Sequence, residues 1–84
     1  MTNRVAGLEA LVVAKRVAAT HDEDELYRRE RKDILAAARA AAYEEEVKGS
    51  PYSTVRGAAI DAALEYLNGR ISNLAHENPF GLVA

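Results

Sequence analysis

The sequence predicts an all-α fold in a single small domain, residues 1–84, and three observations support this prediction. Alanine, the residue with the strongest helix propensity, occurs 17 times in the 84 residues. Apolar residues recur at three- and four-residue spacing, which is the helical period. A capping pattern after residue 20 and a Gly-Ser-Pro turn at 49–51 divide these patterns. We therefore expect three helices, over about residues 4–19, 23–48 and 53–77, the last two forming a long antiparallel hairpin.

The first predicted helix, residues 4–19, is apolar around more than half of its circumference. The apolar residues are Val5, Leu8, Leu11, Val12 and Val13. Thr2 or Asn3 can cap its first turn, and Gly7 weakens it slightly. A helix this apolar is normally covered on more than one side. We expect it to pack across the hairpin or onto another chain.

The second predicted helix, residues 23–48, begins and ends with recognisable signals. Asp22 is followed three residues later by Glu25, a spacing typical of a capping box. At the other end, Gly49 can adopt the left-handed conformation that ends a helix, and Pro51 prevents its continuation.

Charges fill the first half of this helix and alanines fill the second half. Spacings such as that of Asp24 and Arg28 favour ion pairs along one helix. The basic cluster consists of Arg28, Arg29, Arg31 and Lys32. Glu25, Glu30 and Asp33 lie within pairing distance in the sequence, so we expect a salt-bridged, solvent-facing surface. The alanines at 36–42 allow a close approach to one neighbouring helix, with little area buried by each side chain.

The third predicted helix, residues 53–77, carries a repeat of large aliphatic residues. Their spacing alternates between four and three, which is typical of the contact seam of a coiled coil. The seam consists of Ile60, Leu64, Leu67, Ile71 and Leu74. The pattern stays in register across Asn68-Gly69, so we expect a continuous or mildly kinked helix, with a break there as the alternative. An apolar tail, residues 78–84, follows Asn78-Pro79 and includes Phe80.

The composition argues against several classes of chemistry. Cysteine is absent and histidine occurs only at His21 and His76, so we expect no metal site and no cofactor. The acidic cluster at 22–25 lacks the ligand spacing of a calcium loop. No segment carries a phosphate-binding loop or a catalytic triad, which predicts a protein that is not an enzyme and has no small-molecule substrate.

The net charge of −2 argues against general nucleic-acid binding. No apolar run could span a membrane, and the N-terminal segment does not suit a signal peptide, so we expect a cytoplasmic location.

The segment from Tyr52 to Ala58, followed by Leu64 and Leu67, resembles the recognition-helix stretch of GntR-like winged-helix regulators. The resemblance covers about 20 residues and implies a helix-turn-helix DNA-binding regulator. It would place Ser53, Thr54 and Arg56 at the DNA. The sequence departs from that family's pattern before this segment, where the turn is longer and the preceding helix is rich in alanine, and no β-wing follows it.

The excess of apolar helix surface points to a different function. An 84-residue chain has a small core, and exposed apolar patches of this size mark interaction surfaces. We therefore predict a non-enzymatic protein–protein interaction or assembly module, a homo-oligomer or a component docked on a larger complex. A phage structural or regulatory protein would fit, in the cytoplasm or assembled into a virion. The expected contact residues are Val5, Leu8, Leu11, Val12, Ile60, Leu64, Leu67, Ile71, Leu74 and Phe80.

Overall fold

Three helices form the structure, as the sequence predicts. The computed structural model describes the backbone of residues 2–77 and the side chains of residues 2–72. Helix α1 spans Thr2–Thr20, α2 spans Asp24–Val47 and α3 spans Tyr52–Glu77. No strand occurs within residues 2–77, so the all-α prediction is confirmed. The apolar tail at 78–84, with Phe80, lies outside the described residues.

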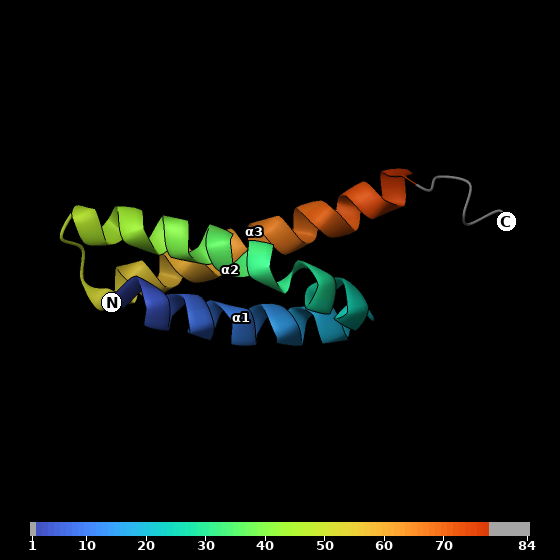
Figure 1. Cartoon of the computed structure of the whole chain (residues 1–84), viewed down its shortest axis with the longest axis horizontal. Coiled ribbons are helices and arrows are strands. Elements are labelled where there is room, and N and C mark those ends of the chain that lie inside the picture. The colour runs from blue at the N-terminus through green and yellow to red at the C-terminus, as the bar shows by residue number, and fades with distance from the viewer. Residues whose placement is uncertain (1, 78–84) are drawn as a thin grey trace, which may run out of the picture.

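The helices lie roughly antiparallel to their chain neighbours and form a bundle (Figure 1). Each helix packs extensively against both of the others. Helix α1 therefore covers the α2–α3 hairpin within the same chain. Helix α3 is continuous through Asn68-Gly69 and extends beyond the α1–α2 turn (Figure 1), so the alternative of a break there is wrong.

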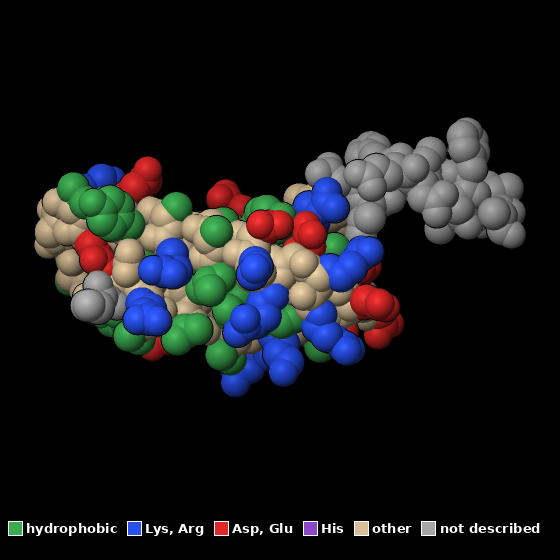
Figure 2. Space-filling view, in the orientation of Figure 1, with side chains coloured by type: hydrophobic (Ala, Val, Ile, Leu, Met, Phe, Trp, Pro, Cys, Tyr) green, Lys and Arg blue, Asp and Glu red, His purple; other side chains and the backbone are tan. Residues whose placement is uncertain are grey.

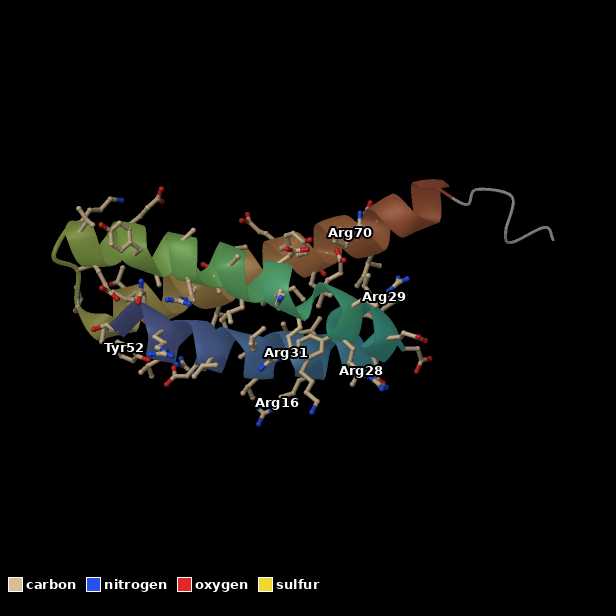
Figure 3. All side chains as sticks on the ribbon, in the orientation of Figure 1. Arg16, Arg28, Arg29, Arg31, Tyr52 and Arg70 are labelled. Atoms are coloured by element: carbon tan, nitrogen blue, oxygen red, sulfur yellow. The ribbon has the colours of Figure 1, made fainter. Side chains whose placement is uncertain are left out.

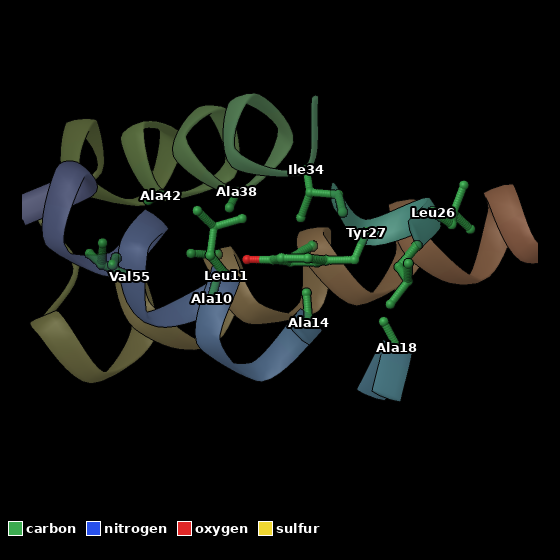
Figure 4. Packing of buried hydrophobic residues seen from close by; sticks show 14 residues of the cluster. Ala10, Leu11, Ala14, Ala18, Leu26, Tyr27, Ile34, Ala38, Ala42 and Val55 are labelled. Atoms are coloured by element: carbon green, nitrogen blue, oxygen red, sulfur yellow. The ribbon is translucent and has the colours of Figure 1, made fainter. Parts of the chain in front are cut away.

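Small side chains at four-residue spacing form the core. Eight of the fourteen buried hydrophobic residues in the described part of the chain are alanine. The buried rows are Ala6, Ala10, Ala14 and Ala18 in α1, Ile34, Ala38 and Ala42 in α2, and Val55, Ala59, Ala63 and Leu67 in α3. Figure 4 shows the larger buried side chains Leu11, Leu26 and Tyr27 beside these rows. Rows at this spacing form ridges, and alanine keeps the ridges low, so that the helix axes can approach closely.

The centre of α3 differs from the predicted coiled-coil seam. Of that seam, Leu67 is fully buried, whereas Ile60, Leu64 and Ile71 are partly buried. The side chain of Leu74 lies outside the described residues. Ala59 and Ala63 therefore face the bundle axis together with Leu67, and the other large aliphatic residues flank them.

The α1–α2 turn does not contain the predicted capping box. Asp22 adopts a left-handed conformation with φ of 59°, and Glu23 precedes α2 without a side-chain capping bond. The Glu23 amide donates to the Ala18 carbonyl at 2.7 Å, and the Asp22 amide donates to the Ala19 carbonyl at 3.2 Å. This pair of bonds is a Schellman motif. Asp22 thus terminates α1 instead of capping α2.

The α2–α3 turn uses the same motif, with the predicted glycine at its centre. Gly49 has φ of 80°, its amide donates to Glu46, and the Ser50 amide donates to Glu45. The Ser50 hydroxyl also donates to the Glu45 carboxylate at 2.8 Å. This hydrogen bond and the contact with Lys48 hold the pKa of Glu45 below its ordinary value. The turn is therefore specified both by its backbone and by its side chains.

Candidate interaction surfaces

The outer face of α1 carries a row of half-exposed aliphatic side chains. Val5, Leu8 and Val12 keep 51–52% of their surface exposed. Hydrophobic side chains are visible over α1 along the lower edge of the molecule in Figure 2. We call these three residues the α1 strip. Their spacing of three and then four residues places them on one side of the helix, away from the buried alanine row.

The structure divides the predicted contact residues into different environments. Leu11 and Leu67 belong to the buried core, so they are not available on the surface. Ile60 and Ile71 pack against that core and are partly buried. Leu64 is also partly buried, and Leu74 and Phe80 fall outside the described side chains. Only the residues of the α1 strip remain as a well-exposed set.

A second apolar patch, which the sequence analysis missed, lies near the α2–α3 turn. Tyr43 and Val47 are exposed there. Tyr43 and Val47 line a shallow hollow together with Glu44 and Lys48. The four-residue spacing of Tyr43 and Val47 was the available signal, because it places both on the side of α2 opposite its buried row.

The α1–α3 boundary holds a polar cluster. The Arg56 guanidinium donates to the Glu9 carboxylate. Partial burial and the same carboxylate raise the pKa of Tyr52. Arg56, expected at DNA in the helix-turn-helix alternative, is thus paired with Glu9 within the molecule.

The geometry around Arg56 also differs from a helix-turn-helix. In that motif two helices cross at about 90–120°. Here α2 and α3 lie antiparallel along their length (Figure 1). Ser53 and Thr54 are exposed in the first turn of α3, at one end of the bundle. Helix α3 therefore does not cross α2 in the way that a recognition helix crosses its partner helix.

The α2–α3 boundary holds a larger polar cluster. The Tyr66 hydroxyl lies 3.0 Å from Glu30 Oε1 and 3.4 Å from Asp33 Oδ2, and it can donate to one of them at a time. Arg70 Nε lies 2.9 Å from Glu30 Oε1 in an ion pair. Burial, followed by the Glu30 carboxylate, raises the pKa of Tyr66 to about 12. Glu30 and Asp33 therefore face α3.

This arrangement overturns the predicted neutralisation of the basic cluster. Among the side chains of residues 2–72, the ion pairs are Lys48–Glu45, Arg56–Glu9 and Arg70–Glu30. Arg28, Arg29, Arg31 and Lys32 take part in none of them. Lys15, Arg28 and Arg31 instead surround a hollow at the α1–α2 boundary, together with Asp24 and Tyr27. Figure 2 shows Lys and Arg side chains spread across this face, with acidic ones mostly at its margins.

The described residues contain neither a metal-binding cluster nor a membrane-spanning helix. No group of three or more His, Asp or Glu side chains in that part of the chain is placed to hold a metal ion. None of the three helices, over the residues described, is apolar along a stretch long enough to cross a membrane.

Comparison with protein-family models, with curated proteins and with solved structures finds no match to the chain.

Proposed function

We propose that the protein is a non-enzymatic helical interaction module that self-associates through the α1 strip. The observation that carries this proposal is the row of three half-exposed aliphatic side chains on a helix whose opposite face is already packed. The largest exposed apolar patch of a small protein is often its interaction surface. The small size of the chain and its all-helical fold suit a building block of a larger assembly, such as a phage component in the cytoplasm or in a virion.

The spacing of the α1 strip suits a second helix as the partner. Val5, Leu8 and Val12 alternate at three and four residues, the spacing of a two-helix contact. Two α1 helices packed antiparallel around Leu8 bring Val5 of each chain opposite Val12 of the other. The same patch then serves both chains, as a two-fold symmetric contact requires.

The exposed area of the α1 strip sets the expected strength of the contact. Fully burying a valine or leucine contributes about 1.5–3 kcal/mol, so covering the exposed halves of three contributes about 2–4.5 kcal/mol per chain. A symmetric dimer doubles this to about 5–9 kcal/mol, and association costs at least about 4 kcal/mol. The favourable end of these ranges leaves about 5 kcal/mol, and the proposal requires this strength, with a dissociation constant on the order of 0.1 mM.

Sedimentation equilibrium over a concentration series that brackets this value tests the proposal. The wild type should shift from monomer towards dimer, and Val12→Asp should remain monomeric because a charge would be buried at the contact. Val47→Asp, the same substitution at an exposed position in the other apolar patch, serves as the matched control and should associate like the wild type. A wild type that stays monomeric throughout, or equal loss of association in both variants, would contradict the proposal.

A further inference from the structure

Four cations line the boundary between α1 and α2. Lys15 comes from α1, and Arg28 and Arg31 come from the facing part of α2. Arg39 lies further along α2, where its side chain occupies the space next to Gly7 of α1: a Cβ added to that glycine would be 2.7 Å from Arg39 Cγ. We call Lys15, Arg28, Arg31 and Arg39 the basic groove. All four side chains are exposed.

The fold leaves the charge of the basic groove largely uncompensated. Glu30, the acid next to Arg31 in the sequence of α2, is held by Tyr66 and Arg70 of α3, and Asp33 lies on the same side of α2, 3.4 Å from the Tyr66 hydroxyl. Within residues 2–72 no carboxylate forms an ion pair with any of the four cations. Asp24 is the one acid that lines the hollow. A chain of net charge −2 therefore presents one distinctly positive face.

The cations of the basic groove are spread along the bundle. Arg28 and Arg39 are 11 residues apart on one helix, which corresponds to about 16 Å at a rise of 1.5 Å per residue. Figure 3 shows Arg28 and Arg31 following the α1–α2 boundary, with Arg16 below them. A single compact anion seated among Lys15, Arg28 and Arg31 cannot also contact Arg39. A linear polyanion can, because double-stranded DNA carries one charge per about 1.7 Å of its axis.

The side chains of the basic groove also favour phosphate over an acidic protein surface. Three of the four cations are arginine, whose planar guanidinium binds phosphate oxygens in a bidentate manner. Tyr27, the aromatic residue of the hollow, is buried among the core side chains, so the hollow itself offers a protein partner no exposed aromatic anchor. We propose that the basic groove binds the phosphate backbone of double-stranded nucleic acid without reading its sequence.

The number of cations predicts how this binding should depend on salt. Four phosphate contacts give a slope of about −3.6 for the logarithm of the binding constant against the logarithm of the salt concentration. Between about 50 and 200 mM salt, affinity should therefore fall roughly 100-fold. None of the four residues belongs to the α1 strip, although Lys15 follows Val12 by one helical turn. Arg31 lies on α2, so Arg31→Glu should weaken nucleic-acid binding and leave the proposed self-association unchanged, which separates the two proposals.

Fluorescence anisotropy with a labelled DNA duplex of arbitrary sequence tests the inference. Wild-type protein should bind at low salt with the expected slope, and a second duplex of unrelated sequence should bind equally well. Arg31→Glu should weaken binding at least about tenfold, as expected when a contacting cation is reversed. Arg29→Glu is the matched control, because Arg29 lies on the same helix but points away from the groove (Figure 3), and it should change affinity much less.

Three results would overturn the inference. The first is no binding of the wild type at low salt. The second is an equal loss of affinity in Arg29→Glu and Arg31→Glu, which would mean that the groove is not the site. The third is displacement of the duplex by polyglutamate at an equal concentration of charge, which would identify an acidic protein segment as the better ligand. Circular dichroism of both variants should match the wild type, since both arginines are exposed.

Discussion

Truncation of Leu67 measures how much of the protein's stability depends on one of the few large side chains in the core. Leu67 is fully buried and is one of the three largest fully buried side chains in the described residues. Leucine-to-alanine substitutions at such positions cost about 2.7–5 kcal/mol. A domain of 84 residues has a stability of about 4–13 kcal/mol in total. We expect Leu67→Ala to lower the free energy of unfolding by about 3 kcal/mol and the melting temperature by about 12–24 °C.

Urea denaturation followed by far-ultraviolet circular dichroism measures this loss, and Leu8→Ala provides the matched control. Leu8 is 51% exposed, so the same substitution should cost less than about 1 kcal/mol in dilute solution. The comparison isolates burial, because residue type and helical context are the same. A loss below about 1 kcal/mol for Leu67→Ala, or equal losses for the two variants, would refute the proposed core.

Three further substitutions test other parts of the fold by thermal or urea denaturation. Gly69→Ala should stabilise the protein by about 0.5–1 kcal/mol, because nothing lies within 4 Å of the added Cβ; destabilisation would mean that α3 is broken there. Gly49→Ala should destabilise it by about 1–2 kcal/mol, because alanine disfavours a φ of 80°; a neutral effect would contradict the left-handed turn. Tyr66→Phe should cost about 1 kcal/mol near neutral pH by removing the hydrogen bond to Glu30. Because the pKa of Tyr66 is raised to about 12, the contribution of its hydroxyl to the free energy of unfolding should be complete below about pH 10 and should disappear as pH rises through 12. If the free energy of unfolding of Tyr66→Phe falls with alkaline pH in the same way as that of the wild type, this contact is contradicted.

The helices were predictable because their signals are local. The observed bounds of all three helices fall within about two residues of those expected from the sequence. Gly49 ends α2 through a backbone conformation that only glycine adopts readily, so residue type alone was informative. Asp22 was misassigned because its side chain suits a cap equally well. Its actual role depends on carbonyl groups of the preceding helix, which a sequence pattern does not reveal.

The core could be predicted only in part, because side-chain size and burial do not coincide here. In the most apolar repeat of α3, Leu67 is fully buried, whereas Ile60 and Leu64 are only partly buried. Ala59 and Ala63, outside that repeat, are fully buried. Close approach of the helix axes places small residues at the centre and moves larger ones to the flanks. Which of two overlapping patterns faces the axis is decided by packing among all three helices.

The charged surfaces were the least predictable feature. In the sequence, Glu30 and Asp33 are adjacent to Arg31 and Lys32, so mutual neutralisation was the natural expectation. Helical geometry turns these acids towards α3, where Tyr66 provides a hydroxyl group 36 residues away from Glu30 in the sequence. The positive face therefore arises from a long-range contact, and the net charge of the chain conceals it.

The position of the self-association contact can be tested directly by nuclear magnetic resonance on dilution. Two-dimensional amide spectra of uniformly labelled protein, recorded through the expected dissociation constant, report which residues change environment. The proposed dimer predicts concentration-dependent shifts concentrated at Val5, Leu8 and Val12, with the amides around Tyr43 and Val47 unchanged. Spectra that do not change with concentration, or shifts confined to the α2–α3 end, would contradict the assignment of α1 as the contact.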